Sequence, residues 1–306
     1  MTRYRNLLLF LVLAVAWGSA FTAIKSGLTY FPPVLFAALR YDVAGVVMLA
    51  YAWYVTDRWF PRTRGEWALV AVGATFMIAA YHSFLFVGEQ GTTSGAAAVV
   101  ISLSPILTVG FSRVLLPSER LSVVGLVGVG LGLVGVAVLA ELDPSNLLGG
   151  NTVSELLVLV AATSFALGSV LTRWIDATLP IETMEAWSMS CGAVLMHLAS
   201  VAMGEPVASI AWTPNALWSL GYLSIVASAG GFLIYFDLLD RLGPVEINLV
   251  SYAVPVFASA TGVALLGERV TVTTAVGFVL IFAGFVALKR AAFRAEIRRL
   301  GEGLWS

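Results

Sequence analysis

The sequence is poor in the residue types that build soluble enzymes and metal centres. Its 306 residues include a single cysteine, Cys191, and two histidines, and only 11% of them are charged. One cysteine excludes both an intramolecular disulfide and a CxxC metal site. No HExxH, GxSxG or Walker sequence occurs, and the GxGxxG spacing at 130–135 follows no strand and lies within an apolar run. The sequence therefore predicts no enzyme, no cofactor and no resident metal.

Apolar residues, by contrast, are abundant. Hydrophobic residues make up 59% of the chain and its mean hydropathy is +0.92, values typical of an integral membrane protein. Apolar runs of about 20 residues, separated by glycine, proline and charge, predict ten transmembrane helices. The predicted helices are 6–25, 33–55, 65–88, 92–116, 121–140, 151–176, 181–203, 214–238, 244–266 and 271–289. Because the connections are short, we expect an all-α membrane protein whose function lies within or between its helices.

The first of these helices imitates a cleavable signal peptide. Arg3 and Arg5 precede an apolar run, and "AVA" at 14–16 resembles a cleavage site. The apolar pattern continues through Trp17 to Ile24, which gives a span of membrane length. We therefore expect a retained helix.

Basic residues set the expected orientation, since lysine and arginine concentrate in cytoplasmic loops. If the N-terminus is cytoplasmic, 14 of the 17 basic residues lie at the cytoplasmic ends of the predicted helices. The three exceptions are Lys25, Arg40 and Arg269. Both termini are predicted to be cytoplasmic, and the basic segment 291–306 is then a cytoplasmic tail that anchors the topology. The net charge of −1 gives no support for nucleic acid as a partner.

The chain also repeats itself. Laying 92–139 on 242–288 matches Pro105 with Pro255 and "LLPSER" at 115–120 with "LLGER" at 265–269. Each half then contains five helices, residues 1–145 in the first and 146–290 in the second. Because five is odd, the second half must enter the membrane from the opposite face. Such inverted repeats are characteristic of alternating-access transporters.

Three stretches carry a family resemblance. They are "WGSAFTAIKSGLTYFPPVLFAALRY" at 17–41, "SPILTVGFSRVLLPSERLS" at 104–122 and "VPVFASATGVALLGERVT" at 254–271. With the duplication, they resemble the drug/metabolite transporter superfamily in its ten-helix EamA-type branch. The resemblance implies a secondary transporter that moves amino acids, other small metabolites or drugs outward across the bacterial inner membrane. It also implies a substrate cavity between helices 1 to 4 and 6 to 9, with helices 5 and 10 peripheral.

Several functions stay open within this resemblance. We expect export of amino acids, including aromatic ones as in one branch of the family, by rocking of the two halves around a midplane cavity. The alternatives are a multidrug or cationic-compound exporter, for which Asp42 or Glu89 could supply a buried carboxylate, and a non-transporting scaffold or sensor. The expected partners are a small-molecule substrate and the lipid bilayer. The substrate range, the coupling ion and the choice between monomer and homodimer stay open, since the glycine-rich helix 121–140 could pack in a dimer or within one subunit.

Polar and aromatic residues inside the apolar runs are the candidates for substrate binding. Trp17 lies near the middle of its helix, where interfacial anchoring does not explain an indole, and His82 is a titratable group that would bind a carboxylate or carry a proton. Packing is the alternative for the aromatic residues, and a hydrogen-bonded interior position is the alternative for His82. The second histidine, His197, is interpreted as structural. The substrate-binding candidates are Trp17, Ser19, Tyr41, Tyr81, His82, Phe165, Trp187, Ser251 and Tyr252.

Two prolines and three charges complete the set of candidates. Pro105 and Pro255 are predicted to lie inside helices near the midplane, as static kinks or as hinges. Arg40 and Asp42 lie about 10 and 13 Å deep in the second helix and point roughly 200° apart around it. For Arg40 the sequence favours a side chain that reaches back to the outer interface, with a gating role as the alternative. Asp42 is expected to face partners or water as a site or proton carrier, and Lys25 is the third candidate for gating or coupling.

Overall fold

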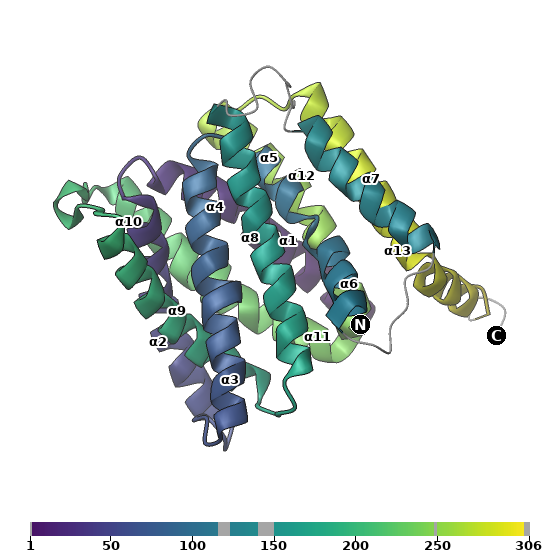
Figure 1. Ribbon diagram of the computed structural model, residues 1–306, viewed down its shortest axis with the longest axis horizontal. Helices are drawn as coiled ribbons and strands as arrows, with labels where there is room; N and C mark the ends of the chain where they lie inside the picture. The colour runs from purple at the N-terminus through teal and green to yellow at the C-terminus, as the bar shows by residue number, and fades with distance from the viewer. Residues whose placement is uncertain (1, 116–122, 140–149, 248–249, 303–306) are drawn as a thin grey trace.

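The computed structural model describes residues 2–115, 123–139, 150–247 and 250–302, and every regular element in these ranges is helical (Figure 1). The first half contains α1 (Thr2–Gly27), α2 (Pro33–Val55), α3 (Arg64–Val72), η1 (Gly73–Ala80), α4 (Tyr81–Glu89), α5 (Ser94–Ile101), α6 (Ser104–Leu115) and α7 (Val123–Leu139). The second half contains α8 (Gly150–Trp174), α9 (Ile181–Ala202), η2 (Val207–Ser209), α10 (Pro214–Gly221), η3 (Tyr222–Gly230), α11 (Gly231–Ile247), α12 (Val250–Leu266) and α13 (Val272–Glu302).

Six helical segments of the described ranges are long and apolar enough to cross a membrane. They are Arg5–Gly27, Pro33–Val55, Arg64–Glu89, Ser94–Leu115, Thr152–Trp174 and Pro214–Leu239, and the shorter apolar helices are Val250–Leu266 and Val272–Ala287. These segments confirm the prediction of an all-α membrane protein.

Several helix ends differ from the expected ones. The helix predicted over 214–238 continues as α11 to Ile247, so Pro244 does not end it. The helix predicted over 271–289 continues to Glu302, and most of the expected tail is therefore helical. Over 290–300 charged side chains alternate with good helix formers, and over 239–247 the helix continues through Gly243 and Pro244. In both places hydropathy alone ends the predicted helix too early.

Pro105 lies beside a helix break. We expected one helix over 92–116 with this proline in its interior, which is wrong. Instead, α5 ends at Ile101 and α6 begins at Ser104, so Pro105 is the second residue of α6, where its missing N–H costs no hydrogen bond. The Ile101 carbonyl, expected to be free, accepts a hydrogen bond from Ser104 Oγ at 2.7 Å. Pro255 lies inside α12, as predicted.

The helices alternate in direction between two ends of the bundle. The arginine end carries Arg58 and Arg173, and the Arg58 guanidinium pairs there with the Glu66 carboxylate. The opposite end, called the glutamate end, carries Glu89, Glu155, Glu205 and Glu268. Helix α1 ends and α13 begins at the glutamate end, so α1 begins and α13 ends toward the arginine end (Figure 1).

Carboxylates of the second half complete helix starts of the first half. The Glu205 carboxylate accepts hydrogen bonds from the Val34 and Leu35 backbone N–H groups at 3.0 and 2.8 Å, in the first turn of α2. The Glu268 carboxylate accepts hydrogen bonds from Ser94 N and Oγ at 3.0 and 3.1 Å, at the start of α5. Free N–H groups at a helix start favour such acceptors. Glu268 therefore anchors the loop after α12 to the start of α5, and Glu119, its match in the repeat, lies outside the described residues.

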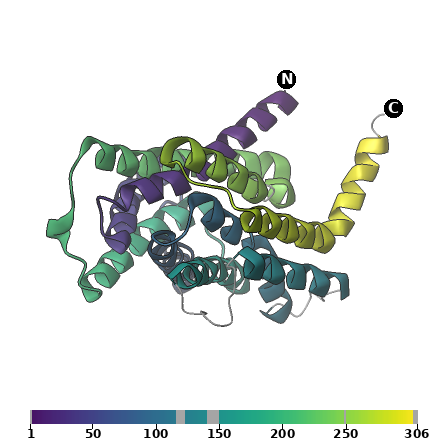
Figure 2. The same cartoon turned by 90° about the horizontal axis from the view of Figure 1, so that it is seen from above.

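Helices α7 and α13 form a pair at one side of the bundle in both views (Figures 1 and 2). A Cβ added at Gly284 of α13 would lie 2.5 Å from the Gly128 carbonyl oxygen of α7, and one added at Gly135 would lie 2.8 Å from the Gly277 oxygen. These glycines let the two backbones touch. The glycine-rich helix thus packs against α13 of the same chain, a partner that the sequence reading did not consider.

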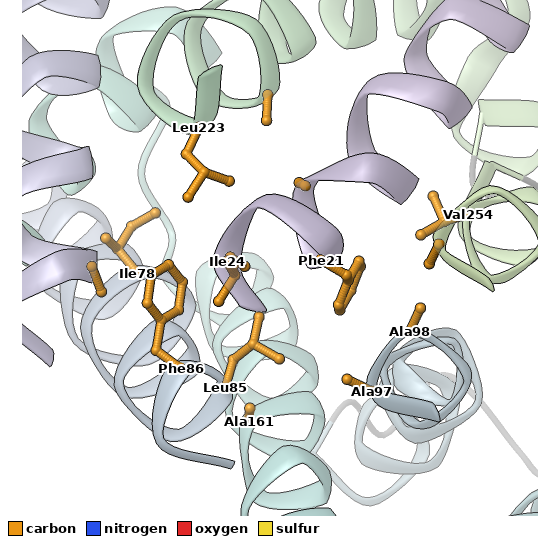
Figure 3. Close-up of a cluster of buried hydrophobic side chains, with 14 of the residues drawn as sticks. Phe21, Ile24, Ile78, Leu85, Phe86, Ala97, Ala98, Ala161, Leu223 and Val254 are labelled. Carbon is orange, nitrogen blue, oxygen red and sulfur yellow. The ribbon is translucent and has the colours of Figure 1, made fainter. Parts of the chain in front are cut away.

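An apolar core inside the bundle surrounds α1. Phe21 and Ile24 of α1 lie between Leu223 of η3, Val254 of α12 and Phe86 of α4 (Figure 3). Gly18 permits the closest approach, since a Cβ there would lie 2.5 Å from Phe257 Cβ. Helix α1 therefore joins the two halves at the core.

In the part of the chain that the structure describes, each half contains one π-helical segment within a long helix, η1 after α3 and η3 after α10. Gly73 and Tyr222, which begin these segments, are 149 residues apart, and the paired Pro105 and Pro255 are 150 apart. The two π-segments therefore occupy equivalent places in the repeat. π-Helical turns leave carbonyl groups available for side chains and are frequent at functional sites.

Candidate functional site

The π-segment η3 receives two polar side chains from the first half. Trp17 Nε1 donates a hydrogen bond to the Ala227 carbonyl oxygen at 3.0 Å, and Arg40 Nε donates one to Ser228 Oγ at 2.9 Å. Ala227 and Ser228 are consecutive, so the indole and the guanidinium reach neighbouring points of η3. Ser19 Oγ lies 2.6 Å from the Tyr222 hydroxyl oxygen at the start of the same segment.

Arg40 belongs to a buried group that we call the central polar cluster, formed by Arg40, Tyr41, His82 and Ser228. Arg40 is only 6% exposed, and its Cζ lies 5.2 Å from the centre of the Tyr41 ring. The Tyr41 hydroxyl lies 2.7 Å from His82 Nε2, and His82 Nδ1 lies 2.9 Å from the Ile78 carbonyl oxygen in η1. Because that carbonyl only accepts, Nδ1 carries a proton, and Nε2 of the neutral ring accepts from Tyr41.

No carboxylate of the described residues pairs with the Arg40 guanidinium. Within the described ranges, Arg40 forms no ion pair, and its hydrogen bond to Ser228 uses Nε and a neutral hydroxyl. A buried guanidinium is stable when an anion or several acceptors complete it. We expected the Arg40 side chain to reach the outer interface. It turns into the bundle instead, where its positive charge is available to a negative group.

Aromatic rings flank the polar cluster on both sides. The Tyr81 ring centre lies 4.4 Å from that of His82 and 5.4 Å from that of Phe165 on α8. On the η3 side, the Trp17 ring centre lies 5.9 Å from Phe232 and 5.6 Å from Tyr235. The structure thus brings together seven of the predicted residues on elements of both halves. These are Trp17, Ser19, Arg40, Tyr41, Tyr81, His82 and Phe165.

The remaining aromatic candidates lie elsewhere. Trp187 Nε1 donates to the Trp59 carbonyl oxygen at 2.8 Å, and its ring contacts Phe60 at the arginine end. Tyr252 packs on α13 with its ring centre 4.2 Å from that of Phe285. Ser251, half-buried, precedes it on α12. Phe165 therefore lies beside the central polar cluster, whereas the rings of Trp187 and Tyr252 pack against other neighbours.

Asp42 lies outside the central polar cluster. Its Oδ2 is 2.7 Å from His197 Nε2, and both side chains are partly exposed, at 44% and 38%. The same helix faces carry the exposed Val46 and Val201. Asp42 faces a partner, and that partner is His197, the histidine interpreted as structural from the sequence.

Lys25 closes the turn between α4 and α5. Its Nζ donates hydrogen bonds to the carbonyl oxygens of Glu89, Gln90 and Thr92 at 2.7, 2.9 and 2.8 Å. An ammonium group at a helix C-terminus satisfies carbonyls that have no partner in the helix. Lys25 thus ties α1 to the glutamate end of α4.

The sequence reading missed two members of the site, Ser228 and Tyr222. Both lie in the apolar run of η3, where Ser228 resembles a small packing residue and Tyr222 an ordinary packed aromatic ring. The internal repeat carried a usable signal, because an offset of 150 pairs Ser228 with Ile78, whose carbonyl holds His82. A π-segment is thus part of the polar site in both halves.

A bundle of membrane-length apolar helices that encloses a polar cluster defines a polytopic α-helical membrane protein of the transporter class. The chain belongs to the EamA-like transporter family, which matches it twice, over residues 5–140 and 152–289. The resemblance to the EamA-type branch is therefore confirmed, and the chain is a transporter and not an enzyme.

Relatives in several bacteria support this assignment. The uncharacterized inner membrane transporter YedA of Escherichia coli K12 is 29% identical and covers 96% of this chain and 95% of its own length. The uncharacterized transporter YoaV of Bacillus subtilis is 28% identical over 88% of this chain and 91% of its own length. A probable amino-acid metabolite efflux pump of Salmonella typhimurium LT2 is 30% identical over 90% of this chain and 91% of its own length.

A solved crystal structure has the same fold. It superposes with a TM-score of 0.66, at 24% sequence identity, and the match covers 96% of this chain and 99% of the other. At this level of identity the likeness establishes the fold alone.

Proposed function

We propose that this transporter exports amino acids, aromatic ones among them, with Arg40 as the group that binds the substrate carboxylate. The observation that carries the proposal is a buried guanidinium that lacks a carboxylate partner among the described residues. An arginine binds carboxylates through two parallel N–H donors, and among the described residues the two terminal nitrogens of Arg40 have no hydrogen-bond partner. The substrate carboxylate would supply the anionic partner that the Arg40 guanidinium lacks.

The aromatic residues beside the arginine fit the remainder of such a substrate. Trp17 and Arg40 reach consecutive residues of η3, so a ligand held at the guanidinium lies within reach of the indole and of Tyr235. Aromatic rings favour apolar and aromatic side chains through face and edge contacts. The name of the Salmonella typhimurium relative, an amino-acid metabolite efflux pump, supports the same class of substrate.

The membrane topology of the proposal is two inverted five-helix repeats, residues 1–145 and 146–290, which cross the membrane ten times. The arginine end is then cytoplasmic by the positive-inside rule, and both termini and the basic segment 291–306 lie on that side. The name of the Escherichia coli relative supports a bacterial inner membrane. The equivalent places of η1 and η3 support rocking of the halves around the central polar cluster, with Pro255 as a second flexible point.

Counterflow in proteoliposomes tests the proposal. Vesicles loaded with unlabelled compound are supplied with labelled phenylalanine, tryptophan, leucine or a lipophilic drug cation, and entry of label is followed. We expect counterflow of the amino acids and none of the cation, because Arg40 repels a cation. If only the drug cation shows counterflow, the protein is a drug exporter and this proposal is wrong. If no compound of the panel shows counterflow, a scaffold or sensor is favoured.

A further inference from the structure

Glu89, the last residue of α4, is a buried acid without a partner. Its exposed fraction is 0%, and neither carboxyl oxygen has a hydrogen-bond partner within the described ranges. Glu205 and Glu268, at the same end of the bundle, accept hydrogen bonds at helix starts. Glu89 sits instead at a helix C-terminus, where the backbone carbonyls disfavour a second negative charge. Its carboxyl is therefore not a helix cap.

The charged groups around Glu89 do not hold it as a carboxylate. The Lys25 ammonium is the nearest positive group, but three carbonyl oxygens occupy it, including the backbone oxygen of Glu89 itself. A buried carboxylate without hydrogen bonds is costly, and the neutral acid is the stable form. The titratable groups that face Glu89 are Lys25 of α1, Arg40 of α2, Glu268 in the loop after α12 and Tyr81 of its own helix.

We infer that Glu89 is a proton-binding site and that its proton is the coupling ion of transport. This inference rests on the proposed function for its transport step. In the present arrangement, Glu89 holds the proton. While the glutamate end is open to water, the carboxylate takes a proton from a hydronium ion and leaves a water molecule, and the reverse transfer returns the proton when the opposite end opens.

Lys25 links this proton to the shape of the transporter. A Glu89 carboxylate competes with the three carbonyl oxygens for the Lys25 ammonium, because an ion pair is stronger than a bond to a neutral carbonyl. Loss of the proton therefore loosens the turn between α4 and α5, and binding of the proton restores it. The closed glutamate end is favoured at low pH and the open one at high pH.

A metal cation fits this place poorly. Sodium requires several oxygen ligands, and the carbonyl oxygens nearest to Glu89 already accept hydrogen bonds from Lys25. The ammonium group also repels a second cation. A proton needs only the carboxyl group itself.

The bound proton can be tested without transport. Infrared spectra of the purified protein at neutral pH are compared between wild type and Glu89→Gln, because a protonated carboxyl has a C=O stretching band that a carboxylate lacks. We expect a band that disappears in Glu89→Gln and remains in Asp176→Asn, which changes an exposed acid. If the difference spectrum has no such band, Glu89 is ionised and the inference is overturned, whatever the protein transports.

The coupling is tested in proteoliposomes with labelled phenylalanine and a trapped pH dye. For one proton per substrate, a gradient of one pH unit should drive about tenfold accumulation. In Glu89→Gln we expect loss of both this accumulation and the dye signal, while exchange at equal pH proceeds. Proton movement that persists in Glu89→Gln overturns the inference, whereas a wild type that exchanges no phenylalanine counts against the proposed function and leaves the infrared result to decide on Glu89.

Discussion

Arg40 and Asp42 are two residues apart on α2 and face opposite sides of the bundle. Arg40 Nε reaches inward to Ser228 at 2.9 Å, and Asp42 Oδ2 pairs on the outer face with His197 at 2.7 Å. Two positions along a helix correspond to a rotation of roughly 200°, so the two charges cannot neutralise each other. Arg40 is therefore available to bind a ligand inside the bundle, and Asp42 lies outside that binding site.

Replacement of Arg40 should weaken binding of amino acids. In Arg40→Gln we expect the loss of about 2 kcal/mol or more of binding free energy, roughly 30-fold in Kd, because the substrate carboxylate loses its charged partner. Binding of labelled phenylalanine to the purified protein measures this change. Arg269→Gln removes an exposed arginine and should leave Kd unchanged. An unaltered Kd in a well-folded Arg40→Gln protein would remove Arg40 from the binding site.

Removal of the Tyr41 hydroxyl should destabilise the protein. In Tyr41→Phe, His82 Nε2 loses its donor inside the bundle, and an unsatisfied buried acceptor costs about 1–3 kcal/mol. Unfolding in detergent should therefore require less denaturant. Tyr54→Phe is the matched control, since Tyr54 is 83% exposed and should give no shift. Equal stability of the two variants would mean that the bond between Tyr41 and His82 contributes nothing.

Asp42→Asn should leave transport and its pH dependence intact. The pair of Asp42 and His197 lies on the outer surface and touches no residue of the central polar cluster. Initial rates of phenylalanine exchange, measured from pH 5 to pH 8 where histidine and buried acids titrate, should superpose on those of wild type. A flattened pH profile in Asp42→Asn would make this pair, and not Glu89, the proton-carrying group.

A side chain at Gly284 should force α7 and α13 apart. A Cβ there would lie 2.5 Å from the Gly128 oxygen, and overpacking of this kind costs about 1–3 kcal/mol. Gly284→Ala should lower the unfolding midpoint in detergent. Gly110→Ala provides the control, because a Cβ at Gly110 meets nothing within 4 Å. A Gly284→Ala protein as stable as the control would show that the backbone contact between the two helices is dispensable.

Much of the fold follows from local signals in the sequence. Hydropathy locates the long apolar helices, and Pro33 marks the start of α2 because proline suits the first helical position. Gly18 of α1, a small residue in a membrane helix, lies against Phe257 of α12. Pro105 shows the limit of such signals, because the same residue fits a kink inside a helix and the first turn of a new one.

The site was predictable in its residue types and not in its contacts. Trp17, Tyr81 and His82 stand out as polar or aromatic groups at membrane depth, and the structure brings all three to the site. The direction of Arg40 depends on how α2 rotates against η3, which one sequence does not specify. Its partner Ser228 resembles a packing residue until that rotation is known.

Glu205 and Glu268, which complete the starts of α2 and α5, are made late during synthesis. The ribosome has produced the whole first half before either carboxylate exists. Until then, the N–H groups of Val34, Leu35 and Ser94 lack the acceptors that they have in the finished protein. The first half therefore waits in the membrane in an incomplete state, and its folding ends only when the second half has been inserted beside it.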